Sequence, residues 1–185
     1  QGGPHYSDLS RIVLERARSA REAVEIVGEL INRYGYSTYG GNSHLFADAN
    51  EGWVLTNFAG GQRLWAAERL GPDDVRVSRP GYIHEFPIDF DNDPDYMASD
   101  NFISFAVDQG WYDPTSGEPF DVYEVYLREV YFGESTPELI QKTNRGAHYI
   151  EDMVRGLGRK VTLADVMHFV RMGSVTHDSA GYGQV

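Results

Sequence analysis

The sequence predicts an α+β fold in which an antiparallel sheet is flanked by helices. Apolar residues recur at helical spacing near the start of the chain and again in its second half. Between these parts lie short segments of strand-like composition, which turn residues separate from one another. Helices segregated from a meander of this kind are typical of α+β domains and not of βαβ repeats.

Residues 7–35 are predicted to be helical. Ser7-Asp8 can cap a first helix, and Ser19 with Glu22 has the pattern of a capping box before a second one. Gly35 is suited to the left-handed conformation that ends many helices. We therefore expect two helices before the first strand.

Residues 43–86 are predicted to form an antiparallel meander. The segment 49–52 is rich in turn residues and lies between two strand-like runs, which predicts a hairpin. The expected strands are 43–48, 53–57, 63–69 and 75–78.

Residues 87–96 are predicted to be an acidic loop. Four aspartates alternate there as in calcium-binding loops, but Pro94 stands where such a loop needs Gly, and Asp100 stands where it needs Glu. The main interpretation is a solvated loop with local turns. A calcium site is the alternative, and its ligands would be Asp89, Asp91, Asp93 and Asp95.

Residues 97–173 are predicted to be mainly helical, followed by a tail at 174–185, so that residues 1–185 form one domain. Asp121 with Glu124, Thr136 before Pro137, and Thr162 with Asp165 are the expected helix starts.

Composition excludes several functions. The chain has 16 basic and 28 acidic residues, a net charge of -12, which argues against binding to nucleic acid or to anionic membranes. It has no cysteine, hence no disulfide, thiolate metal site or cysteine nucleophile of its own. No apolar run reaches the roughly 18 residues of a membrane span. Its histidines show no metal-binding spacing, and His177-Asp178-Ser179 are too close in sequence for a catalytic triad.

Several long strings resemble one family and occur in its order. They are Leu14–Val24, Gly41–Asp48, Glu51–Leu55, Trp65–Arg69, Asp95–Ser104, Gly110–Pro114 and Asp178–Val185. The set resembles the bacterial cysteine dipeptidases of the N-terminal-nucleophile (Ntn) hydrolase superfamily, relatives of bile-salt hydrolase and penicillin V acylase.

This resemblance implies a four-layer αββα sandwich and hydrolysis of dipeptides by a mature N-terminal Cys, as in a thiol protease, with no cofactor. The sequence departs from the family because it begins at Gln1, has no Cys and is short. We therefore expect a fragment, or one chain of a split enzyme, whose partner is a second polypeptide segment carrying the N-terminal Cys. Cytoplasmic localisation is expected from the resemblance alone, and an oligomer is left open.

Two residues are the candidates for substrate binding. Family members commonly carry Glu at the position of Thr56, which Asn57 follows. They often carry an Asn after the Val-rich strand expected at 75–78, where this chain has 78–82 without Asn. Asn57 and Arg79 are therefore the polar groups expected near a cleft. The alternative interpretation is a turn or edge-strand residue for Asn57 and a surface ion pair for Arg79.

Two functions follow from these observations. The first is the central portion of a dipeptidase, inactive by itself because the nucleophile is missing. The alternative is a noncatalytic acidic binding or assembly module that reuses the same scaffold.

Overall fold

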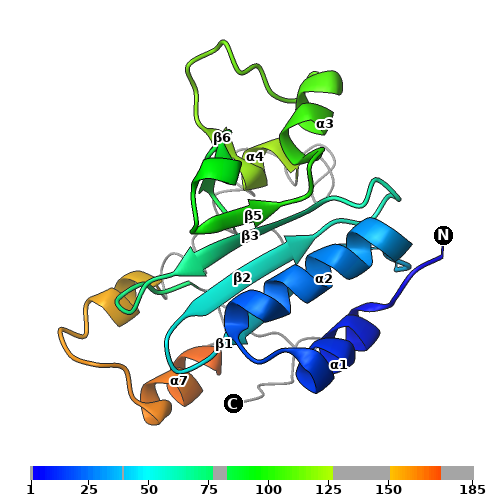
Figure 1. Cartoon of the computed structure of the whole chain (residues 1–185). Helices are drawn as coiled ribbons and strands as arrows, with labels where there is room; N and C mark the ends of the chain where they lie inside the picture. The colour runs from blue at the N-terminus through cyan, green and yellow to red at the C-terminus, as the bar shows by residue number, and fades with distance from the viewer. Residues whose placement is uncertain (1, 39, 77–82, 127–150, 172–185) are drawn as a thin grey trace. The chain divides into compact units, whose positions relative to one another are not determined.

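The structure is a computed structural model that describes residues 2–38, 40–76, 83–126 and 151–171 (Figure 1). The chain divides into two compact units. Of the described residues, 2–38, 40–74 and 83–126 belong to the first unit, and 75–76 and 151–171 belong to the second. Within the described ranges, no helix is long and apolar enough to cross a lipid bilayer.

The first unit contains a four-stranded antiparallel sheet with the strand order β1-β2-β3-β5. Its strands are β1 (Asn42–Ala47), β2 (Gly52–Asn57), β3 (Trp65–Leu70) and β5 (Tyr96–Ala98). The β1–β2 hairpin turns as the sequence predicts, because the Asp48 carboxylate accepts backbone hydrogen bonds from Asn50 (2.7 Å) and Glu51 (3.1 Å). The sheet and its helices confirm the α+β class.

Two helices precede the sheet, as predicted, but the first starts differently. α1 (Tyr6–Arg16) has His5 as its N-cap, and Asp8 completes a capping box by accepting the backbone N–H of His5 (3.1 Å). Histidine is not among the preferred N-cap residues, so the pattern pointed to Ser7-Asp8 instead.

α2 (Ala20–Tyr34) starts and ends where the sequence predicts. The Ser19 hydroxyl accepts the backbone N–H of Glu22 (3.1 Å), whereas the Glu22 carboxylate accepts that of Arg18 (2.7 Å) and not that of Ser19. In the predicted capping box, Glu22 therefore binds the backbone N–H of the residue before Ser19 and not that of Ser19 itself. Gly35 ends the helix with φ 81°, a conformation that glycine adopts without strain.

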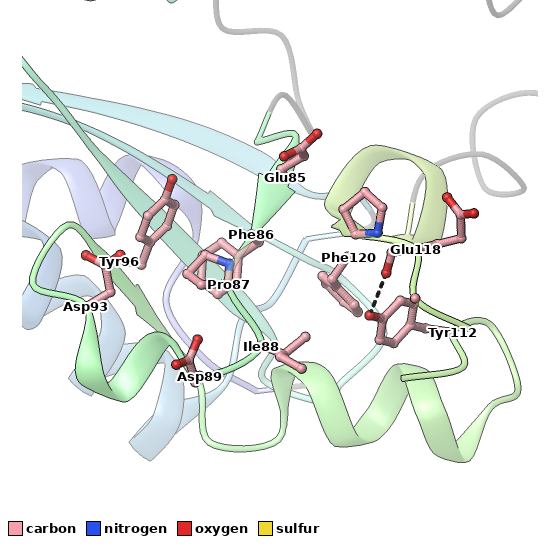
Figure 2. Close-up of a pocket in the computed structure, with 12 residues that line it drawn as sticks. Glu85, Phe86, Pro87, Ile88, Asp89, Asp93, Tyr96, Tyr112, Glu118 and Phe120 are labelled. Carbon is pink, nitrogen blue, oxygen red and sulfur yellow. Dashed lines mark hydrogen bonds between the residues drawn. The ribbon is translucent and has the colours of Figure 1, made fainter. Parts of the chain in front are cut away.

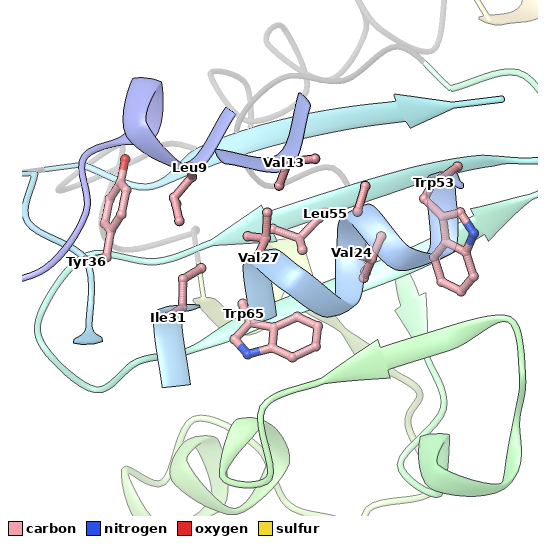
Figure 3. Packing of buried hydrophobic residues seen from close by; sticks show 12 residues of the cluster. Leu9, Val13, Val24, Val27, Ile31, Tyr36, Trp53, Leu55 and Trp65 are labelled. Carbon is pink, nitrogen blue, oxygen red and sulfur yellow. The ribbon is translucent and has the colours of Figure 1, made fainter. Parts of the chain in front are cut away.

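The side of the sheet that packs against α1 and α2 is here called the helix-covered face (Figure 3). Odd-numbered residues of β2 and β3 lie on it, since side chains alternate along a strand. At Gly28 of α2 a Cβ atom would lie 2.4 Å from a ring carbon of Trp65, so only glycine allows this approach. Its fully or almost fully buried residues include Leu9, Val13, Val24, Val27, Ile31, Trp53, Leu55, Trp65 and Ala67.

A second part of the first unit, here called the aromatic region, is built from short elements. They are β4 (Glu85–Phe86), η1 (Phe90–Asn92), α3 (Phe102–Asp108), β6 (Phe120–Asp121) and α4 (Val122–Tyr126). β4 and β6 pair as a two-stranded antiparallel sheet. The ring of Phe102, which is fully buried, has its centroid 4.9–5.9 Å from four other rings, those of Phe58, Phe86, Phe120 and Tyr126.

The described part of the second unit contains α7 (Leu163–Val170). Thr162 and Asp165 form the predicted capping box at its start. Arg159 binds the Asp165 carboxylate through two nitrogens (2.7 and 2.8 Å), and these bonds lower the pKa of Asp165.

Several expected elements differ in the structure. β3 starts at Trp65 and not at 63, because Arg63 has φ 61°, which is incompatible with a strand. Residues 75–76 are not in a strand, and the place beside β3 is taken by β5. β5 and β6 also interrupt the segment 97–173 that was expected to be helical. Two or three residues are too few for a periodic pattern to show.

Some expectations lie outside the described residues: the helix start at Thr136, part of the last strand at 77–78, and the tail at 174–185. The Ntn sandwich and the single domain over residues 1–185 stay predictions.

Candidate functional site

Asn57, the candidate that the sequence singled out, is the last residue of β2. It pairs with Asn42 of β1 on one side and with Trp65 of β3 on the other. It therefore lies within the sheet, and the interpretation as an edge-strand residue is wrong. Asn57 is fully buried, and it occupies the same row as Trp53 and Leu55 of the helix-covered face.

The side chain of Asn57 is unusual for its position. Neither its amide nitrogen nor its amide oxygen has a partner with hydrogen-bond geometry among the described residues. A buried amide left in this state costs about 1–3 kcal/mol. Buried polar groups in native proteins are nearly always paired. Among the described residues the Asn57 side chain interacts with that of His44, but no atom pair between them has hydrogen-bond geometry.

His44 lies on β1, the strand next to β2, and on the same face of the sheet as Asn57. It is two residues from Asn42. The Asn42 amide nitrogen is 3.1 Å from Nε2 of His44, whose ring stacks on Phe46 at 5.9 Å between centroids. Burial lowers the pKa of His44 to about 4. An interaction with the Asn57 side chain raises this pKa and so opposes part of the shift. The ring is thus neutral near pH 7 and accepts a hydrogen bond from Asn42.

Three polar residues therefore meet at one end of the β1–β2 pair: Asn42, His44 and Asn57. The sequence pattern did not indicate Asn42 and His44 as a group, because two residues on one face of a strand follow a period of two and not the helical period expected of paired histidines. The signal was the alternation of Asn42, which precedes the predicted strand 43–48, with His44 and Phe46 within it, because alternate residues of a strand share one face.

Thr56 points to the opposite face of the same strand. Its hydroxyl lies 3.3 Å from that of Ser43, the residue with which it pairs across the hairpin, and it is 1% exposed. The two polar candidates at the end of β2 are thus separated by the sheet itself.

Arg79 lies outside the described residues, as do His177, Asp178 and Ser179. Asn101 stands at the N-cap of α3 but makes no side-chain cap; its amide donates to the carbonyl oxygen of Gln62 (3.1 Å) instead. This bond ties Asn101 to the loop between β2 and β3.

The acidic loop is held by two arginines. The Arg69 guanidinium forms an ion pair with Asp95, and this bond raises the pKa of Arg69. Arg21 of α2 donates to the carbonyl oxygen of Pro94, and its guanidinium lies 4.9 Å from the ring centroid of Trp53. The loop is thus anchored to β3 and α2.

The four aspartates of the calcium alternative lie in and beside this loop. Among the residues that the structure describes, no three His, Cys, Asp or Glu are placed to share a metal ion. Asp95 is bound to Arg69, and the carboxylate of Asp93 accepts the backbone N–H of Asp95 (2.9 Å). Calcium at Asp89, Asp91, Asp93 and Asp95 stays an untested prediction.

Comparisons with known proteins agree on one kind of protein. Residues 1–135 match the family model described as Peptidase family C69. The chain is 34% identical to a probable dipeptidase of Salmonella dublin over 122 residues, 65% of this chain and 27% of the relative. It is 35% identical to probable dipeptidase B of Lactococcus lactis over 147 residues (78% and 29%), and 30% identical to dipeptidase A of Lactobacillus helveticus over 152 residues (82% and 29%).

These matches define the class as a peptidase family, in keeping with the resemblance seen in the sequence. The chain belongs to peptidase family C69. It spans less than a third of the length of these curated relatives.

Proposed function

We propose that this chain is part of a dipeptidase that cleaves its substrate with an N-terminal cysteine supplied by a second polypeptide segment. The observation that carries the proposal is the family match over residues 1–135, together with relatives that are named dipeptidases. The chain has no Cys, so the nucleophile has to come from elsewhere.

The chemistry follows from the resemblance to Ntn hydrolases. The cysteine thiol attacks the scissile carbonyl carbon, its proton goes to the α-amine of the same residue, and that amine protonates the leaving amine. Water then hydrolyses the acyl-enzyme. Hydrogen-bond donors around the carbonyl oxygen stabilise the tetrahedral intermediate.

The role proposed for this chain is to supply the sheet and part of the substrate pocket. The buried amide of Asn57 supports this role, because its interaction with His44 lacks hydrogen-bond geometry, which leaves both amide atoms available to the second segment or to the substrate. Arg79 is proposed as a second polar group of the pocket.

A complementation experiment tests the proposal. This chain is co-expressed with a segment that carries the N-terminal Cys, and the purified complex is assayed on a broad dipeptide panel. We expect hydrolysis by the complex, none by this chain alone, and none when the Cys is replaced by Ala. A tightly assembled complex that is inactive on the whole panel would overturn the proposal in favour of the noncatalytic binding or assembly module.

Substitutions at Asn57 test its part in the complementing complex. Asn57→Leu removes both amide atoms at similar size, and Asn57→Asp keeps one oxygen acceptor but loses the donor. If the donor is used, both variants lose activity while the complex still assembles. If only the acceptor is used, the Asn57→Asp variant alone retains activity. Unchanged activity in both variants excludes Asn57 from the site.

A further inference from the structure

A hollow in the aromatic region is lined by apolar side chains and by carboxylates. It has a volume of about 560 Å³ and lies between β4, the acidic loop, β5 and the segment leading into β6. In Figure 2, Tyr96 and Asp93 are drawn on one side of Pro87, with Tyr112 and Phe120 on the other. Its lining residues are Glu85, Phe86, Pro87, Ile88, Asp89, Asp93, Tyr96, Tyr112, Gly117, Glu118, Pro119 and Phe120.

The apolar part of the wall is held by ring contacts. Phe86 pairs with Phe120 across the β4–β6 ladder, and its ring meets that of Tyr96 edge to face at 5.1 Å. Tyr112 meets Phe120 at 4.9 Å and donates a hydrogen bond to the carbonyl oxygen of Glu118 (3.0 Å). These aromatic walls are therefore positioned before any ligand arrives.

Ile88 lines the same hollow and is 52% exposed. A large aliphatic side chain that stays half in water beside buried aromatic rings leaves apolar surface that a ligand can cover.

The charged side chains of the wall are all acidic. The lining includes four carboxylates and no Lys, Arg or His. Asp93 belongs to the loop that Arg21 and Arg69 anchor through its neighbours Pro94 and Asp95, so its carboxylate is held on a fixed backbone. Both anchoring arginines lie outside the lining, and Arg69 interacts electrostatically with the Asp93 carboxylate from there.

We propose that this hollow binds a lysine or arginine side chain of a peptide. The aliphatic stem of such a side chain fits against Ile88 and the aromatic rings, while its cationic head reaches Asp89 and Asp93. Ring faces attract cations as well, and a chain of net charge -12 favours the approach of a basic peptide. The occupant is thus chosen by charge complementarity and by the apolar surface next to the charge.

This inference goes beyond the proposed hydrolysis and does not depend on it. The hollow contains none of Asn42, His44 and Asn57, and binding there requires no nucleophile. A chain without any peptidase activity would still show the binding.

Titration with small probes tests the proposal on this chain. The probe is N-acetyl-lysine methylamide, and the matched controls are the same molecule acetylated on its side-chain nitrogen and the norleucine analogue, which keeps the stem without the charge. Binding is followed by NMR shifts of the Ile88 methyl groups. We expect the lysine probe to bind about tenfold tighter than either control, as one partly exposed ion pair allows, and to weaken with added salt.

Variants locate the binding. Asp89→Asn with Asp93→Asn removes two charges at constant size, and Asp108→Asn removes an exposed charge outside the lining. The double variant is expected to bind the lysine probe about tenfold more weakly, while Asp108→Asn binds as the parent chain does.

Several results would overturn the proposal. Equal affinity for the lysine and norleucine probes would make the hollow a purely apolar site. Displacement of the lysine probe by low calcium would indicate a metal site. Unchanged binding by a folded double variant would place the peptide elsewhere on the chain.

Discussion

The helix-covered face and the aromatic region stabilise the same unit in different ways. On the helix-covered face, a helix of 15 residues lies along a regular sheet, and the contacts are between aliphatic side chains and two tryptophans. In the aromatic region, the two paired strands have two residues each, and rings from distant parts of the chain hold the elements together. One part relies on regular elements, the other on a few large side chains.

The difference has a consequence for function. On the helix-covered face, His44 and Asn57 are buried and Asn42 is half-buried. The aromatic region leaves an open hollow beside its rings. Loops carry binding surfaces when a rigid scaffold positions them, and here the rings and the two anchoring arginines provide the rigidity.

The largest expected effect comes from Phe102→Ala, a change that should destabilise the aromatic region more than the helix-covered face. Phe102 is fully buried and touches four rings, so the change should lower the free energy of unfolding by about 3–5 kcal/mol. Denaturant unfolding measures the loss, and amide hydrogen exchange shows where it falls. We expect faster exchange in α3 and α4 than in α2.

Phe105→Ala is the matched control for this change, because Phe105 is only partly buried and its loss should cost less. Equal acceleration of exchange in α2 would show that the two regions open as one unit and would contradict their separate stabilisation.

The next effect is a pH dependence on the helix-covered face. The pKa of His44 is lowered from 6.5 to about 4, so the unfolded chain takes up the proton first as the pH falls. The stabilisation by the neutral ring is complete above about pH 6.5 and is lost between pH 6.5 and 4, by about 3 kcal/mol in all.

Unfolding free energies across this pH range measure the effect. His44→Leu should flatten the pH dependence, whereas His168→Gln, at an exposed position, should leave it in place. The same slope in the parent chain and in His44→Leu would show that His44 is not buried in a neutral form.

The smallest effect tests the close approach of α2 to the sheet. Gly28→Ala places a methyl group against the Trp65 ring and should cost about 1–3 kcal/mol. Gly52→Ala is the control, since the nearest atom to its Cβ would be at 3.8 Å, an ordinary contact. Thermal unfolding of both variants compares them. Similar stabilities would mean that α2 can move away from β3 at no cost.

The helix-covered face was largely predictable from the sequence. Ser19, Glu22 and Gly35 mark both ends of α2, and the turn at 49–52 gives the hairpin. The aromatic region was not predictable, because β4 and β6 are far apart in the sequence and too short to show a periodic pattern. Arg63 shows the same limit, since its positive φ follows from tertiary contacts and not from its type.

The candidate site was predictable in part. Asn57 follows from its place after a predicted strand, but its burial depends on β3 pairing on its other side. His44 could be placed beside Asn42 only once the face of β1 was known. The hollow unites residues from 85 to 120 through ring contacts that no spacing rule encodes.

The three tryptophans lie in three different surroundings. Trp53 is buried beneath the Arg21 guanidinium, Trp65 is buried and donates from Nε1 to Asn32 (2.9 Å), and Trp111 is 44% exposed in the aromatic region. An aqueous quencher such as iodide should therefore reach the emission of Trp111 long before that of the other two. The fluorescence of Trp111 thus reports on the aromatic region, and that of Trp53 and Trp65 reports on the helix-covered face. The loosening of either region can therefore be followed without any label.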